Sequence, residues 1–163
     1  MKKTLIQFLY EQGIEHRMPH VYLDMDGVLV NLEKGAFKVH GANLGDVPKP
    51  ERWDKINTIK DFWKNLEWMP GAEKLWNFLK PYAPSIMSAW TKHDPNSAGG
   101  KADWLKSHVG KLPRSRVNLV MRQDKNDLQK MEEQNNLTYL LMTIQRISES
   151  GKRMEVLEFT ILV

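Results

Sequence analysis

The chain has 163 residues, a formal net charge of +4 and no cysteine, and no apolar run in it approaches the ~20 residues that cross a bilayer. One domain, or a core with one insertion, accounts for this length, and the absence of cysteine excludes disulfide bonds and thiolate chemistry, which agrees with a cytoplasmic location. Because the basic residues are spread among acidic ones and polar residues interrupt the N-terminal apolar stretch, we expect no nucleic-acid partner, no membrane partner and no secretion signal.

The segment HVYLDMDGVLV, from His20 to Val30, begins as an apolar run, meets two aspartates and a glycine, and then resumes as apolar. This pattern predicts a buried parallel strand that runs into a turn. Carboxylates that follow such a strand lie at the carboxyl edge of the sheet, where open α/β folds bind ligands. Asp24 and Asp26 are therefore candidate ligands of Mg²⁺, which prefers hard oxygen atoms. The alternative is a plain acidic turn or a Ca²⁺ loop, which the full string DMDGVLVN disfavours.

Residues 33–68 are polar and aromatic, and they contain the Gly/Pro-rich stretch GANLGDVPKPERW between two expected helices. We interpret them as a small helical cap inserted after the first strand, with residues 1–32 and 69–163 forming the core. Several aromatic side chains of this region could stack on a nucleobase, although aromatic residues at helical spacing more often form the core of a cap. They are Phe37, Trp53, Phe62, Trp63 and Trp68.

Helices and strands are expected to alternate after Pro70. The segment AEKLWNFLKPY carries Leu75, Phe78 and Leu79 at helical spacing and should pack on the sheet. SIMSAW predicts a second strand, TKHDPNSAGG a loop, KADWLKSHVGKL a helix, and RVNLVM a third strand that leads into RQDK. This alternation predicts a doubly wound α/β core.

Two of these strings resemble a known family. DMDGVLVN resembles the first motif of the haloacid dehalogenase-like (HAD) phosphohydrolases, and FWKNLEWMPGAEKLWNFL resembles the segment of the 5'(3')-deoxyribonucleotidases that closes the cap. The resemblance implies a HAD-like Rossmannoid core of three layers with a parallel sheet, and hydrolysis of nucleoside monophosphates, deoxyribonucleotides among them. It also implies that Asp24 attacks phosphorus to form an aspartyl-phosphate, that Asp26 acts as general acid and base, and that both help to hold Mg²⁺.

The same resemblance assigns phosphate-binding residues. Ser88, in SIMSAW, fits the second motif, in which a hydroxyl donates to the phosphoryl group, although Ser-Ala-Trp replaces the Thr-Ser-Pro-like string of the deoxyribonucleotidases. Lys125 matches the third-motif lysine that neutralises the phosphate. Lys101 resembles a further lysine of the family, with an ordinary solvated helix lysine as the alternative. The candidate substrate contacts are Phe37, Trp63, Trp68 and Lys101.

The fourth family motif, an Asp-Asp pair that completes the magnesium site, is missing after Lys125. Residues 140–161 can be back-translated and each codon's last base regrouped with the first two bases of the next codon, which permits the family-like string LIDDYPKNIREWEANGGIGIHH. In that frame Met142 followed by Thr143 must encode an aspartate. We therefore hypothesise that loss of one nucleotide near the codons for Lys125 to Lys130 replaced the native C-terminus over about residues 126–163.

Three alternatives stay open. The chain can be a divergent protein whose last strand is LTYLLMTI and whose metal site is completed by another residue or by water. It can be a phosphate-ligand binder that retains the site but performs no chemistry. Nucleic-acid binding through the basic surface ranks last because no basic cluster accompanies the charge. The sequence does not distinguish a monomer from a homodimer.

Overall fold

The structure is a computed structural model that describes residues 20–90, 92–121, 124, 139–147 and 154–162. Its strands form one sheet in the order β3-β2-β1-β4-β5. Neighbouring strands are parallel from β3 to β4, and β5 pairs antiparallel with β4. The predicted α/β class with a parallel sheet is therefore confirmed. The strands are β1 (His20–Leu23), β2 (Ser85–Trp90), β3 (Val117–Met121), β4 (Tyr139–Ile147) and β5 (Met154–Leu162).

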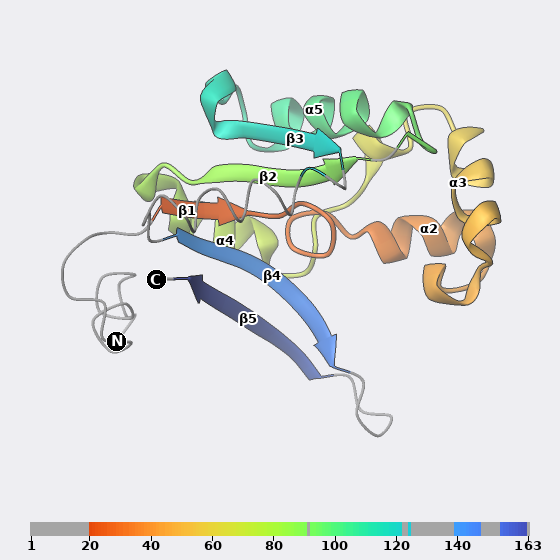
Figure 1. Ribbon diagram of the computed structural model, residues 1–163, viewed down its shortest axis with the longest axis horizontal. Helices are drawn as coiled ribbons and strands as arrows, with labels where there is room; N and C mark the ends of the chain where they lie inside the picture. The colour runs from red at the N-terminus through yellow and green to blue at the C-terminus, as the bar shows by residue number, and fades with distance from the viewer. Residues whose placement is uncertain (1–19, 91, 122–123, 125–138, 148–153, 163) are drawn as a thin grey trace.

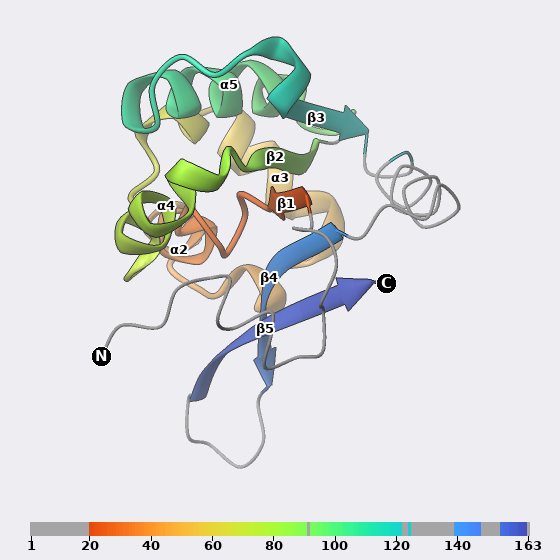
Figure 2. The same ribbon diagram turned by 90° about the vertical axis from the view of Figure 1, so that its left-hand side faces the viewer.

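Two helices cover one face of this sheet and two lie beyond its edge. Helices α4 and α5 lie on the same face of the sheet (Figure 2), whereas α2 and α3 lie beyond the carboxyl ends of β1, β2 and β3 (Figure 1). Helices thus occupy the 33–68 segment, while its division from the core and the third layer stay predictions. The helices are α2 (Leu32–His40), α3 (Lys49–Asn57), α4 (Ala72–Leu79) and α5 (Asn96–His108). Short 3₁₀ turns are η1 (Leu44–Asp46), η2 (Trp63–Asn65), η3 (Lys80–Tyr82) and η4 (Arg114–Arg116).

The predicted strand and turn near the start of the described chain are present. Strand β1 ends at Leu23, and the backbone N–H groups of Val28, Leu29 and Val30 all donate to the carbonyl oxygen of Met25. Gly27 has a φ of 77°, a left-handed conformation that glycine adopts without strain. The apolar residues of this tight turn are buried, so the turn is anchored in the core at the edge of the sheet.

Helix α4 lies against the core as predicted at Leu75 and Leu79, but not at Phe78. Its buried residues are Ala72, Trp76 and Leu79, which follow one another at helical spacing. The prediction that Phe78 packs on the sheet is wrong, because its side chain is 43% exposed. Once Trp76 and Leu79 face inward, the helical rotation of about 100° per residue turns position 78 outward.

Helix α5 begins earlier than predicted. The loop expected for TKHDPNSAGG is wrong from Asn96 onward, because the helix starts there and includes both glycines. The Asp94 side chain accepts a hydrogen bond from the backbone N–H of Asn96 at 3.2 Å, which satisfies one donor of the first turn. Gly100 lies so close to Trp63 that a side chain at this position would collide with it.

Replacing Gly100 with alanine should destabilise the fold. A Cβ atom at this position would lie 2.5 Å from the Trp63 Cβ atom, so we expect a loss of about 1–3 kcal/mol in the free energy of unfolding. The neighbouring Gly99, in the same helix, has nothing within 4 Å of such an atom. Gly99→Ala should therefore stabilise by about 0.5–1 kcal/mol, as alanine does in a helix interior. Denaturant unfolding of both variants measures this, and equal shifts would contradict the tight α5–Trp63 contact.

The segment that follows η2 is joined to α2 by ion pairs. The Glu67 carboxylate accepts from the Lys34 ammonium at 2.6 Å and from the Lys38 ammonium at 2.7 Å. These two hydrogen bonds lower the pKa of Glu67 from 4.5 to about 2. Since the folded state holds the lower pKa, the contribution of Glu67 to stability is present above pH 4.5 and is lost as the pH falls toward 2.

The expected effect of Glu67→Gln is a small loss of stability at pH 7 that shrinks below pH 4.5. The loss should also shrink in 1 M salt, because these side chains are about half exposed. Thermal unfolding of the variant and the unchanged protein at pH 3 and pH 7 measures this loss of stability. The control is Glu73→Gln, since Glu73 forms no ion pair with any described residue. A loss of equal size at pH 3 and pH 7 would show that Glu67 acts through something other than its charge.

No helix within the described ranges is long and apolar enough to span a membrane.

Candidate active site

Asp24 and Asp26 follow β1, where they alternate with buried apolar residues. Leu23 and Met25 are fully buried, whereas both aspartates are partly exposed. The backbone N–H of Met25 donates to the Asp24 carboxylate at 2.7 Å, which fixes that side chain at the start of the turn. The turn that begins at Gly27 then directs the chain away, so both carboxylates lie at the carboxyl edge of the sheet as predicted.

Ser88 lies on the neighbouring strand. It belongs to β2, which pairs in parallel with β1, and its side chain is fully buried. Because parallel strands direct their carboxyl ends to one edge, residues that are 62 or more positions apart in sequence can share one site. Ser88 and Asp26 are in fact joined through a third residue, Lys101.

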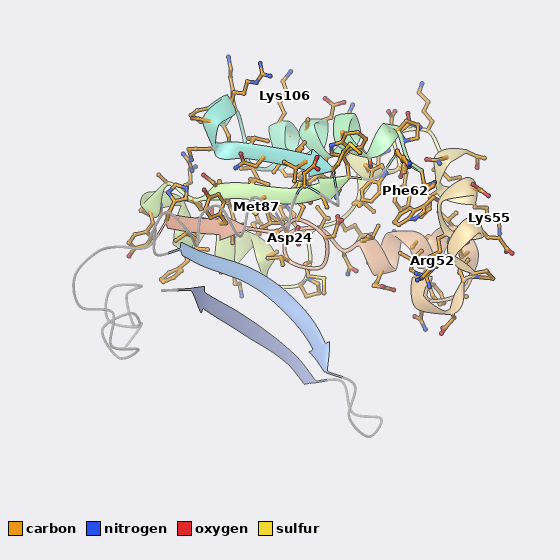
Figure 3. All side chains as sticks on the ribbon, viewed as in Figure 1. Asp24, Arg52, Lys55, Phe62, Met87 and Lys106 are labelled. Atoms are coloured by element: carbon orange, nitrogen blue, oxygen red, sulfur yellow. The ribbon has the colours of Figure 1, made fainter. Side chains whose placement is uncertain are left out.

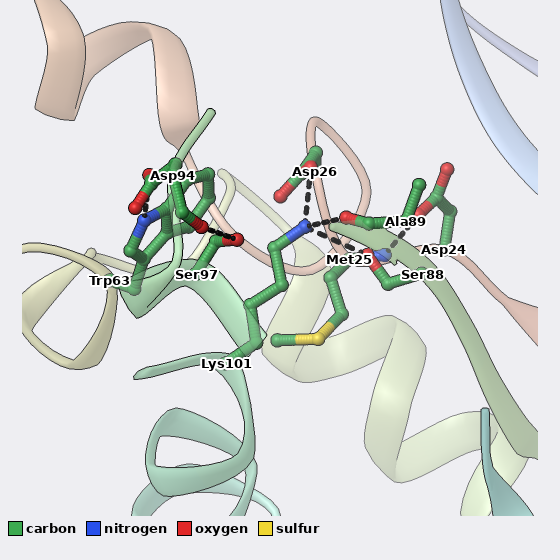
Figure 4. Close-up of polar contacts among 9 residues, drawn as sticks. All are labelled: Asp24, Met25, Asp26, Trp63, Ser88, Ala89, Asp94, Ser97 and Lys101. Carbon is green, nitrogen blue, oxygen red and sulfur yellow. Dashed lines mark hydrogen bonds and ion pairs between the residues drawn. The ribbon is translucent and has the colours of Figure 1, made fainter. Parts of the chain in front are cut away.

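Lys101 places a buried ammonium group at this edge. Only 1% of the residue is exposed, and its Nζ donates to Asp26 Oδ2 at 2.7 Å, to Ser88 Oγ at 3.1 Å and to the Ala89 carbonyl oxygen at 2.6 Å. Figure 4 shows the side chain reaching from α5 toward these three groups. The Trp63 ring lies against the same ammonium, 4.8 Å from its centroid. The alternative of a solvated helix lysine is therefore wrong.

Burial of the Lys101 ammonium would be unfavourable without its three hydrogen-bond partners. An ammonium group removed from water is tolerated only when it is paired and fully hydrogen-bonded. Lys101 achieves this with three oxygen atoms, of which the Asp26 carboxylate and the Ser88 hydroxyl are also predicted site residues. A fixed cation beside a carboxylate and a hydroxyl can bind an anionic group such as a phosphate.

Helical spacing contains the signal that would have identified Lys101. The buried residues of α5 are Ser97, Lys101, Trp104 and Leu105, so the lysine occupies the inward face of the helix. A lysine flanked at four and three positions by inward-facing residues is a candidate for a buried cation. The predicted loop over Asn96 to Gly100 hid this spacing.

Asp94 is a site residue that sequence patterns missed. It is fully buried, and its Oδ2 atom accepts a hydrogen bond of 2.6 Å from the indole N–H of Trp63. Burial raises the pKa of Asp94, while the hydrogen bond from Trp63 opposes that shift. No local pattern predicts the pair, because its members are 31 residues apart.

The aromatic residues of 33–68 have different environments. Trp63 is buried, and Trp53 stacks on it with 6.1 Å between ring centroids. Trp68 packs edge-on against Trp104 of α5, with 4.7 Å between centroids. Phe37 is 51% exposed on α2. Contacts of Phe37, Trp63 and Trp68 with a substrate stay predictions.

The third-motif lysine and the metal site are two further predicted parts of the active site. Lys125 lies outside the described residues. Among the residues that the structure describes, no group of three or more histidine, aspartate and glutamate side chains is arranged to hold a metal ion. Asp24 nonetheless supplies carboxylate oxygens and Asp26 a backbone carbonyl oxygen, and Mg²⁺ is commonly held by one or two carboxylates together with water and substrate phosphate. The donor set therefore fits Mg²⁺ as a partial site.

No model of a known protein family matches the chain, and no curated protein matches it significantly.

Proposed function

We propose that this chain is a HAD-type phosphohydrolase that removes phosphate from nucleoside monophosphates, deoxyribonucleotides among them. The observation that carries the proposal is the buried Lys101 ammonium, which joins Asp26 to Ser88 at the carboxyl edge of the sheet. These residue types can together perform phosphoryl transfer, since they supply a carboxylate nucleophile, an acid/base, a hydroxyl donor and a cation. The resemblance of DMDGVLVN to the first HAD motif supports the assignment of Asp24 as the nucleophile. A cytoplasmic location belongs to the same proposal.

The proposed reaction has two steps. In the first, an Asp24 carboxylate oxygen attacks phosphorus, the bond from phosphorus to the nucleoside oxygen breaks, and Asp26 gives its proton to that oxygen. In the second, a water molecule attacks the phosphorus of the aspartyl-phosphate and gives its proton to Asp26, which releases phosphate and restores the Asp24 carboxylate. In both steps Ser88 donates to a phosphoryl oxygen, and the Lys101 ammonium donates to another after giving up one of its three present hydrogen bonds.

Magnesium completes this chemistry when it is bound. It offsets the repulsion between the Asp24 carboxylate and the phosphate dianion and keeps that carboxylate ionised. Asp24 and Asp26 are the residues that would hold it. The three hydrogen bonds of Lys101 hold its ammonium beside Asp26. The ammonium group therefore lies next to the residues that would bind the metal ion.

The register of β4 supports the idea that the fourth motif was lost by a shift of the reading frame. In the parallel pairing of β1 with β4, Leu23 lies opposite Met142. Thr143 follows Met142 as Asp24 follows Leu23. The regrouped frame requires an aspartate from the codons of Met142 and Thr143, so that aspartate would fall beside Asp24, where a further metal ligand is needed. The rival interpretation, a divergent last strand at LTYLLMTI, is compatible with the same strand.

A phosphate-ligand binder without turnover is the second candidate. The observation that favours it is the lack, among the described residues, of a third acidic side chain near Asp24 and Asp26. Such a protein would bind inorganic phosphate through Lys101 and Ser88 but would release none from a monophosphate.

The test is phosphate release from a panel of deoxyribonucleoside and ribonucleoside monophosphates with Mg²⁺. The chain as given is compared with a version that carries the regrouped C-terminal sequence. Turnover by both versions, or by the regrouped version alone, supports the proposed lineage, and the second result also supports the shifted frame. Phosphate binding without turnover by either version supports the second candidate. A gene whose alternate frame does not encode the Asp-Asp string excludes the frameshift.

A further inference from the structure

We infer that Trp63 and Asp94 form a positioning pair that holds the Lys101 ammonium on Asp26 and Ser88. The effect on turnover rests on the proposed function, whereas the effect on Lys101 itself does not. The pair joins the insertion between β1 and α4 to the start of α5 through one buried hydrogen bond of 2.6 Å.

A lysine at this site needs external support. Its four-carbon stem is flexible and its ammonium has no preferred direction, so packing must select one conformation. The Trp63 ring lies 4.8 Å from the Lys101 Nζ atom, within the range of a cation–π interaction. The ring therefore bounds the space in which the ammonium can move, on the side away from the sheet edge.

Trp63 is held in place from two directions. Its backbone and Cβ atom lie against Gly100, the residue before Lys101, where a side chain would collide. Its indole N–H donates to Asp94 Oδ2. The absence of a side chain at Gly100 and the hydrogen bond to Asp94 thus fix the ring relative to α5, the helix that carries Lys101 (Figure 4).

Asp94 in turn is bound to the first turn of α5. Its Oδ1 atom accepts from the backbone N–H of Asn96, and its carbonyl oxygen accepts from the Ser97 hydroxyl at 2.7 Å. A fully buried carboxylate is unfavourable unless its oxygens are hydrogen-bonded. Trp63 supplies one of these bonds from η2, so the Asp94 carboxylate, two residues before α5, depends on the insertion for one of its hydrogen bonds.

The first test is chemical modification of lysines by an amine reagent, read by peptide mass spectrometry. In the unchanged protein Lys101 should react slowly, while Lys106, exposed on the same helix, should react fast and serve as the internal reference (Figure 3). Trp63→Phe keeps a ring but removes the N–H donor. We expect the rate at Lys101 relative to Lys106 to rise about ten- to hundredfold, the factor that corresponds to a lost hydrogen bond to a charged group.

Trp104→Phe is the matched control. Trp104 is also fully buried, and its indole N–H donates to the Leu66 carbonyl oxygen at 2.7 Å, but that bond does not reach Asp94. We expect its Lys101 rate to stay near that of the unchanged protein. An equal rise in both variants would overturn the inference, because it would reflect general loosening of α5. Protection of Lys101 that survives Trp63→Phe would overturn it too.

Asp94→Ala tests the pair from the other side, because alanine has no oxygen that could accept the Trp63 indole N–H, and it replaces Trp63→Phe if that variant does not fold. It should expose Lys101 as well, and the double variant should add little to either single change, since both remove one interaction. Additive effects would contradict a shared role.

Kinetics separates this inference from the proposed function. If the protein is active, Trp63→Phe should lower kcat/KM by about tenfold, with a higher KM because the phosphate meets a misplaced cation. Exposure of Lys101 without turnover by either the given chain or the version with the regrouped C-terminus would support the positioning pair and contradict the enzyme. Turnover with Lys101 still protected in Trp63→Phe would support the enzyme and contradict the pair.

Discussion

Asp24→Asn should abolish phosphate release, with a fall in kcat of roughly 10³-fold or more, because an amide cannot serve as the nucleophile. The fold should survive. The asparagine side chain keeps an Oδ1 acceptor, so it can still accept the hydrogen bond of the Met25 backbone N–H that Asp24 accepts at 2.7 Å. The side chain is also partly exposed, so no cavity forms. Steady-state phosphate release and thermal unfolding of the same preparation measure both expectations.

Asp103→Asn is the matched control for this variant, since Asp103 is an exposed carboxylate on α5. It should leave phosphate release unchanged. If Asp24→Asn retained more than about a tenth of the activity, a covalent route through Asp24 would be excluded, since removal of a nucleophile has much larger effects.

Lys101→Met should lower kcat/KM by about 10²- to 10³-fold, the effect of removing one preorganised donor to a developing charge. Methionine retains the length of the stem but not the ammonium, so Asp26, Ser88 and Ala89 lose a shared donor. We expect KM to rise as well as kcat to fall, because the cation binds phosphate before and during its transfer. Kinetics with a deoxyribonucleoside monophosphate measures the two constants separately.

Lys106→Met provides the comparison for Lys101. Lys106 lies on the same helix but is exposed, so its replacement should change neither kcat nor KM. Full activity of Lys101→Met would mean that the buried ammonium serves only to hold Asp26 and the strand ends together. Circular dichroism of both variants distinguishes lost activity from lost structure.

The carboxyl edge of the sheet was predictable from sequence because it depends on local patterns. The apolar strand before Asp24 and the strand that contains Ser88 each carry their own signal, and parallel pairing brings strand ends together. Gly27 marks the turn that follows both aspartates and leads into the buried residues after it. This part of the site follows from the order of the elements alone.

The rest of the site depends on contacts between distant residues. The sequence leaves Lys101 open between a substrate contact and a solvated helix lysine, because lysines are usually exposed, and only the packing of α5 shows its burial. Gly99 and Gly100 predicted a loop, yet the contact of Gly100 with Trp63 overrides their low helix propensity. The partner of Trp63 is Asp94, 31 residues along the chain, a distance over which no periodicity operates.

The most direct test of the central claim is whether Asp24 becomes phosphorylated during the reaction. The chain, or the version with the regrouped C-terminus, is mixed with Mg²⁺ and a deoxyribonucleoside monophosphate and quenched in acid, and its peptides are mapped by mass spectrometry. We predict a phosphoryl group on the peptide that contains Asp24, absent from the Asp24→Asn variant. Phosphate release in a single turnover with no phosphoryl group on Asp24, or with one on another residue, would contradict the proposed mechanism.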